Sequence, residues 1–177
     1  MKKLCVSICL VVALLLCAVP VSAASNFTAS NTTVSYYYDP GTESTYEVSI
    51  PEKFSLYTDI GEGFGITATS MNIVDGYELR ISVAEETFAN DGNFYLYLNG
   101  QSSSEYRMPC RIATIQDDSN DYLTVTKDEN NVIATYRGTD TNAHTGGTVI
   151  FFPGSCTQKG TYSGTVVFNL AVYDVTE

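Results

Sequence analysis

Residues 160–173 read Gly-Thr-Tyr-Ser-Gly-Thr-Val-Val-Phe-Asn-Leu-Ala-Val-Tyr, and this stretch is the strongest indication of the fold. A period of two in β-branched and aromatic residue types predicts one long strand. Such a strand needs a second sheet to cover its apolar face. The predicted core face of the strand, with Gly164 in the same series, consists of Tyr162, Val166, Phe168, Leu170 and Val172.

Shorter alternating runs precede this stretch and are bounded by Gly, Pro, Asn and Asp. Asp75-Gly76 between residues 65–74 and 77–83 predicts a hairpin with a tight turn, and Asn99-Gly100 predicts a second turn of the same kind. No long helix is indicated. The pattern predicts an all-β, immunoglobulin-like two-sheet sandwich of about ten short strands, with a closed barrel as the alternative.

The first 23 residues have the features of a secretory signal peptide. Lys2 and Lys3 precede an apolar run over residues 8–19, and a small-x-small pattern ends at Ala23. This pattern predicts cleavage after Ala23, with Ala24 as the alternative. A membrane anchor is disfavoured, because the apolar run is too short to span a membrane. Residues 24–177 then form a single β-sandwich domain, and the predicted location is extracellular.

Charge narrows the classes of partner. The chain carries 9 basic and 20 acidic residues, and loss of Lys2 and Lys3 with the leader takes the net charge from −11 to −13. This excess disfavours nucleic acid and anionic membrane surfaces. The expected partner is a protein or a cell-wall or glycan surface, with no membrane span in the mature chain.

Two cysteines remain after the leader is removed. A pair in an exported chain predicts one disulfide, between Cys110 and Cys156. It would close a loop of about 47 residues and contribute roughly 4 kcal/mol in the chain-entropy model. The alternative is two buried free thiols.

No arrangement of residues marks a catalytic centre. His144 is the single histidine and lies in a Thr/Gly/Asn loop, and no serine stands in a nucleophile-elbow pattern. Carboxylates for a glycosidase pair are present, but the chain has no Trp to form a sugar platform. The protein is expected not to be an enzyme and to need no cofactor.

Several residues are candidates for binding or modification. Residues 117–121 read Asp-Asp-Ser-Asn-Asp, so Asp117 and Asp121 are candidate calcium ligands, with a solvated acidic turn as the alternative. Asn26 and Asn31 fit the N-glycosylation pattern. Alternating tyrosines are candidates for a binding face or for the edge of the core: Tyr36, Tyr38, Tyr95 and Tyr97.

The last stretch, with Gly160-Thr-Tyr162-Ser-Gly164 followed by Phe168-Asn-Leu170, resembles the terminal motif of the WxL family. Residues 46–51, Tyr-Glu-Val-Ser-Ile-Pro, look like the strand-to-proline entry of such exported sandwiches. The family consists of secreted surface proteins of Gram-positive bacteria held noncovalently on the cell wall, and Phe168 stands where the family has Trp. The same stretch also looks like the terminal strand of fimbrial subunits.

These expectations combine into a secreted, noncatalytic β-sandwich with a binding or adhesion role at a cell surface or in the extracellular matrix. The alternatives are a pilus or fibre subunit that assembles by strand exchange, and a glycan-binding module.

Overall fold

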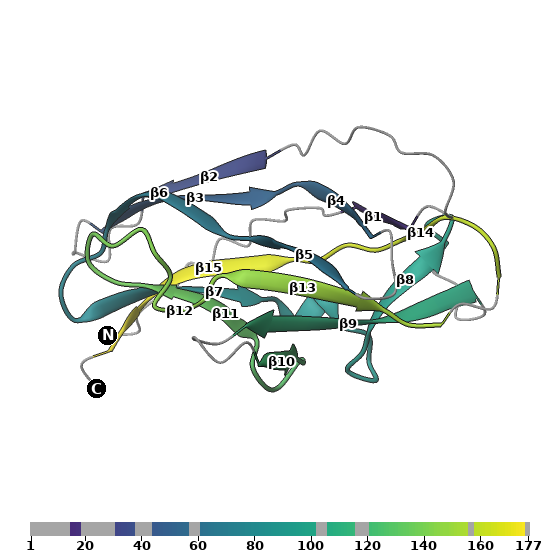
Figure 1. Cartoon of the computed structure of the whole chain (residues 1–177). Helices are drawn as coiled ribbons and strands as arrows, with labels where there is room; N and C mark the ends of the chain where they lie inside the picture. The colour runs from purple at the N-terminus through teal and green to yellow at the C-terminus, as the bar shows by residue number, and fades with distance from the viewer. Residues whose placement is uncertain are drawn as a thin grey trace.

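The computed structural model describes residues 15–18, 31–37, 44–56, 61–101, 106–115, 121–155 and 158–175. For residues 15–18, residues 31–37 and Phe54, the description covers the backbone alone. The described chain is almost entirely β and includes the 3-10 turn η1 (Glu85–Thr87). The sequence therefore predicts the fold class correctly, since the strands form a sandwich-like all-β molecule (Figure 1).

The described strands belong to three sheets. The largest has the order β4 (Lys53–Leu56), β1 (Leu15–Ala18), β14 (Tyr162–Ser163), β8 (Phe94–Leu98), β9 (Arg107–Ile115), β13 (Thr148–Pro153) and β5 (Glu62–Gly65), with β10 (Tyr122–Val125) also paired to β9. The second has the order β12 (Thr145–Gly146), β11 (Val132–Tyr136), β7 (Tyr77–Val83) and β15 (Phe168–Asp174). The third contains β2 (Asn31–Tyr37), β3 (Thr45–Pro51) and β6 (Thr67–Asn72).

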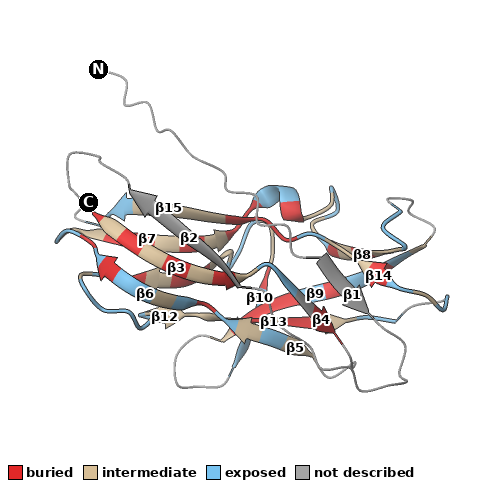
Figure 2. Cartoon of the chain, turned by 90° about the horizontal axis from the view of Figure 1, so that it is seen from above, coloured by how far each residue is buried: buried red, intermediate tan, exposed pale blue. Residues whose placement is uncertain are grey.

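All three sheets supply side chains to one core. Buried residues alternate with half-buried ones along β3, as the pleat requires, and are drawn red in Figure 2. One apolar cluster joins the sheets, and its members include Val48, Ile81, Ile112, Phe151 and Phe168. No helix in the described part of the chain has the length and apolar character needed to cross a membrane.

The terminal stretch is not one long strand, so that prediction is wrong. It divides into β14 in the largest sheet and β15 in the second, and residues 164–167 cross between them. Tyr162, Val166 and Phe168 are buried as predicted, whereas Leu170 and Val172 are only partly buried against the core. The break is stabilised by Thr87, whose hydroxyl accepts the Val167 N–H at 2.9 Å.

The predicted hairpin at Asp75-Gly76 is also wrong, although the turn itself forms with Gly76 at φ 85°. β6 before the turn pairs with β3, and β7 after it pairs with β11 and β15, so the turn links two sheets. Asn99-Gly100 differs: both residues have positive φ, and β8 pairs with the following strand β9. The Asp-Gly and Asn-Gly pairs thus predicted the positions of both turns, but they did not predict which strands pair.

One strand lies inside the predicted leader. β1 (Leu15–Ala18) pairs parallel with β4 and antiparallel with β14, and Figure 1 shows it between these two strands. The other described strand pairs are antiparallel. The flanking residues 1–14 and 19–30 lie outside the described part of the chain.

Candidate functional site

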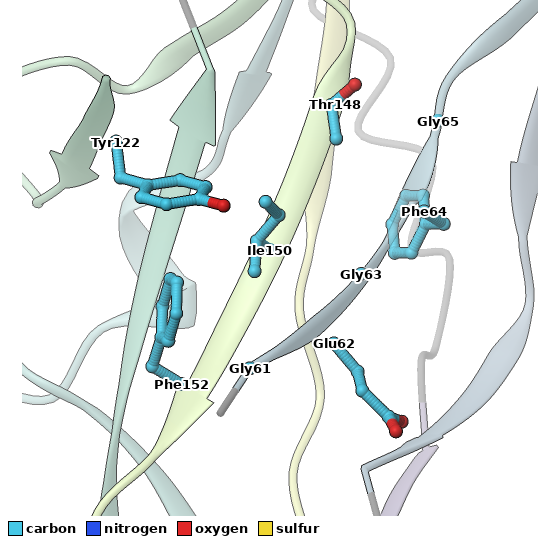
Figure 3. A pocket seen from close by; sticks show the side chains of 9 residues that line it. All are labelled: Gly61, Glu62, Gly63, Phe64, Gly65, Tyr122, Thr148, Ile150 and Phe152. Carbon is cyan, nitrogen blue, oxygen red and sulfur yellow. The ribbon is translucent and has the colours of Figure 1, made fainter. Parts of the chain in front are cut away.

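A shallow hollow on the outer face of the largest sheet is created by alternating glycines. Gly63 and Gly65 lie opposite Ile150 and Thr148 of β13, so this face of β5 has no side chains beside them. The hollow has a volume of about 300 Å³. We call it the glycine-strand hollow, and its lining (Figure 3) is Gly61, Glu62, Gly63, Phe64, Gly65, Tyr122, Thr148, Ile150 and Phe152.

Two aromatic rings form one wall of this hollow. The Tyr122 and Phe152 centroids are 5.4 Å apart with an interplanar angle of 76°, an edge-to-face arrangement. Figure 3 shows both rings on one side of Ile150, while the Glu62 side chain points away from them. Tyr122 is 50% exposed, so its ring is open to a partner. The guanidinium carbon of Arg111 lies 4.2 Å from the Phe152 centroid and stabilises that ring from outside.

The glycines differ in what they tolerate. A Cβ on Gly61, which has φ 89°, would meet the Phe152 ring, and one on Gly63 would meet the Val149 carbonyl of β13. These two positions therefore require glycine because of close approach. A Cβ on Gly65 would have Gly147 O, at 3.8 Å, as its nearest neighbour, so this position is open.

Two of the tyrosines predicted as candidates line a second, larger hollow. The Tyr95 and Tyr97 ring centroids of β8 are 6.5 Å apart. The hollow has a volume of about 610 Å³, and we call it the tyrosine hollow. Its lining is Glu86, Thr87, Phe88, Ala89, Phe94, Tyr95, Tyr97, Gly100, Ser163, Gly164 and Thr165.

A small polar cluster holds Tyr95 in place. Its hydroxyl donates to Asp91 Oδ2 at 2.9 Å, and the guanidinium carbon of Arg107 lies 3.9 Å from its ring centroid. The hydrogen bond from Tyr95 lowers the pKa of the Asp91 carboxyl, and the same bond raises the pKa of the Tyr95 phenol. Arg107 Nη2 also lies 3.6 Å from Asp91 Oδ2. The ring is therefore oriented before any partner arrives.

The remaining candidates are not brought together. Tyr36 lies in β2 opposite Tyr46, but only its backbone is described, and Tyr38 and Asp117 lie outside the described residues. Asp121 is exposed just before β10. Within the described ranges no group of three or more His, Cys, Asp and Glu side chains could hold a metal ion, and the calcium hypothesis stays a prediction.

In the described part of the chain, Cys110 forms no disulfide. Cys110 is a buried free thiol, and burial raises its pKa to about 12. Cys110 lies opposite Pro153, the last residue of β13. Pro153 precedes Cys156 by three residues in the sequence. Cys156 itself lies outside the described residues, so the pairing stays a prediction.

His144 is exposed directly before β12. The backbone and side-chain amides of Asn142 donate to the Asp140 carboxylate and lower its pKa, and His144 adds a smaller contribution in the same direction. These are surface contacts that order a loop. They do not by themselves make a nucleophile or an acid–base pair.

Sequence reasoning missed the glycine-strand hollow, although a signal was present. Residues 61–65 read Gly-Glu-Gly-Phe-Gly, which in a strand places every glycine on one face. The neighbouring Tyr122 and Phe152 are 57 or more residues away in sequence, and no local pattern connects them.

No protein-family model, curated protein or solved structure matches the chain.

Proposed function

We propose that this chain is a secreted, noncatalytic β-sandwich that binds a partner at a cell surface or in the extracellular matrix. The observation that carries the proposal is the exposed Tyr122 ring beside a strand without outward side chains. An aromatic face next to an open backbone surface suits a flat apolar group with polar edges. A sugar ring has this shape, and so does an extended peptide with a small apolar side chain.

The overall charge supports a neutral or cationic partner. With a net charge of −13 after loss of Lys2 and Lys3 from the full chain's −11, the chain repels polyanions at long range. Arg111 has its guanidinium over Phe152, which forms part of the wall of the hollow. We therefore expect a neutral glycan chain or a protein segment, presented on a cell wall or matrix.

The test is a binding assay with matched tyrosine variants. Wild type, Tyr122→Ala and Tyr173→Ala are compared on immobilised neutral glycans, purified cell walls and matrix proteins. Tyr173 is the control because it is similarly exposed, at 45%, but lies on β15 with Arg80 over its ring. Tyr122→Ala should weaken binding at least about tenfold, as loss of an aromatic anchor does, and Tyr173→Ala should not.

A second variant tests the open floor of the hollow. Among the three glycines of the hollow, only Gly65 has a free Cβ direction, so Gly65→Phe should block binding without disturbing the strand. Equal binding by wild type, Tyr122→Ala and Gly65→Phe would show that the partner does not use this hollow. The immobilised material that binds the wild-type protein, glycan or protein, identifies the class of partner.

A second candidate function is a subunit that assembles by strand exchange. It is favoured by the position of β1, a strand from the predicted leader that completes the largest sheet.

A further inference from the structure

Cleavage of the leader would open a place in the largest sheet. β1 lies between β4 and β14, and in the described part of the chain it is the one strand paired with β4 in that sheet. Removal of residues 1–23 would therefore leave β4 and β14 with facing edges, separated by the place of the one strand that Figure 1 shows between them. We call this space the β1 seat. Its register is Leu15 opposite Lys53, Leu16 opposite Phe54, Cys17 opposite Ser55, and Ala18 opposite both Leu56 and Tyr162.

An empty β1 seat is unfavourable. The N–H and C=O groups of two strand edges lose their partners, and such edges readily pair with another extended segment. Leu56 and Tyr162 are only 2% and 3% exposed with β1 in place, and both lie opposite Ala18. Ala18 is the small residue at that register position, so we expect an inserted segment to carry a small residue there.

We propose that in the exported protein residues 26–29 of a second copy of this chain fill the β1 seat, an inference that rests on the export included in the proposed function. Cleavage after Ala23 leaves seven residues, 24–30, ahead of β2. Within them Asn26-Phe-Thr-Ala29 repeats the pattern of Leu15-Leu-Cys-Ala18, a large apolar residue two positions before an alanine. Phe27 would take the position of Leu16, and Ala29 that of Ala18.

The same chain cannot place this segment parallel to β4, because its tether is too short. Ala29 in the position of Ala18 would lie opposite Leu56, whereas Asn31 is held opposite Pro51, five residues earlier along β3 and β4. Five strand residues span roughly 16 Å. The two residue steps from Ala29 to Asn31 reach about 7 Å at most.

An antiparallel insertion by the same chain fails for a different reason. It would continue the β2–β3 register, in which Asn31 lies opposite Pro51, along β4. Asn26 would then lie opposite Leu56, and Phe27 opposite Ser55. Directly opposite residues share a face, so the Asn26 amide would be buried beside an apolar residue at a desolvation cost. A segment from a second copy avoids both problems, because the β2–β3 pairing of the accepting copy does not set its register.

The resulting assembly is head-to-tail. Each copy donates its first residues and accepts those of another copy at a different surface, so the contact is heterologous and extends into chains or rings. The assembly also depends on leader removal, since β1 occupies the seat in the precursor.

The first test is the size of the mature protein, residues 24–177, by size-exclusion chromatography with light scattering. Wild type should form multimers, Phe27→Glu should be monomeric, and Ser25→Glu should behave as wild type. Ser25→Glu is the matched control, because it adds the same charge as Phe27→Glu just before the four residues proposed to insert. Both substitutions precede β2 in the sequence.

The second test is cross-linking between copies. Asn26→Cys in one protein and Lys53→Cys in another should give a mixed disulfide dimer, because residue 26 would take the position of Leu15 opposite the exposed Lys53. Unmixed single variants and wild type provide the blank for the native cysteines. An internal cross-link in a monomeric double variant would show that the segment folds back onto its own chain and would overturn the proposal.

These outcomes are separate from those of the binding assay. A mature protein that is monomeric and still loses binding on Tyr122→Ala would overturn strand exchange and keep the proposed function. N-terminal sequencing of the exported protein tests the premise, and retention of residues 15–18 would also overturn the proposal.

Discussion

Phe168 begins β15 with its ring fully buried against Phe64, at 6.3 Å between centroids and an interplanar angle of 80°. Its side chain has no exposed surface and belongs to the apolar core. The next residue, Asn169, is half-buried and pairs with Ser82 of β7.

Phe168→Ala should lower the free energy of unfolding by about 3 to 5 kcal/mol, through lost burial and a residual cavity. Asn169→Ala should cost much less, because it removes no buried ring. Chemical denaturation of both variants measures the difference. If Phe168→Ala unfolds at the wild-type midpoint, the ring is not part of the core.

Glu78 of β7 is the buried carboxylate of an ion-pair network. Arg137 Nη2 lies 2.6 Å from its Oε2, and Arg80 donates from Nε to its Oε1. Burial alone would raise the pKa of this carboxyl. The hydrogen bonds and positive charges of Arg80 and Arg137 outweigh burial, so the pKa lies below the ordinary value of 4.5.

A lowered folded-state pKa predicts a specific dependence on pH. The contribution of Glu78 to stability is fully present above its unfolded pKa and is lost as the pH falls through the lowered folded value. Glu78→Gln should therefore cost about 1 to 3 kcal/mol at neutral pH, and the gap to wild type should narrow below about pH 4.

Denaturation curves measured across pH test this prediction. Glu52→Gln, at an exposed position after β3, is the matched control and should change little. A gap between wild type and Glu78→Gln that is constant with pH would mean that the carboxylate charge contributes nothing.

Strand β5 combines two roles in its glycines. Gly63 allows the backbones of β5 and β13 to approach closely, whereas Gly65 leaves the floor of the glycine-strand hollow open. The two positions share one face and the same pairing partner, so they form a matched pair for mutation.

Gly63→Ala should destabilise the protein by more than about 1 kcal/mol, because the added methyl group meets the backbone of β13. Gly65→Ala should be neutral or should stabilise by about 0.4 to 1 kcal/mol, since it restricts the unfolded chain at an open position. Thermal and chemical unfolding of the two variants measure this. A reversed order would contradict the close approach at Gly63.

Across the domain, the pairing of Cys110 with Cys156 is open to a direct test. Cys110 lies opposite Pro153, and Cys156 follows three residues later, so the chain is long enough for the two to meet. Mass spectrometry of non-reduced exported protein should find a peptide that links them. If both cysteines are instead free, Cys110 should resist alkylation at neutral pH until the protein is unfolded, because its pKa is raised to about 12.

Strand positions follow from local sequence, since the pleat alone requires side chains to alternate between faces. For this reason β3, β8, β9 and β11 lie where alternating runs occur, and the all-β class was predictable. The burial of Tyr162 and Phe168 was predictable for the same reason, whereas Val166 lies between β14 and β15, where the neighbouring Val167 is buried as well.

Strand partners depend on contacts between distant segments, and no local pattern specifies them. Asp75-Gly76 and Asn99-Gly100 have the same turn chemistry, yet one links two sheets and the other joins paired strands. The break at residues 164–167 likewise depends on Thr87, 80 residues earlier.

The glycine-strand hollow and the β1 seat belong to this second class. The hollow needs the glycines of β5 to lie beside Tyr122 and Phe152, and the seat needs β4 and β14 to flank one strand width. Residue types along the chain establish which segments extend and which faces are apolar. Which surfaces meet is decided when the sheets pack, because burial of those faces is shared by segments that are far apart in sequence.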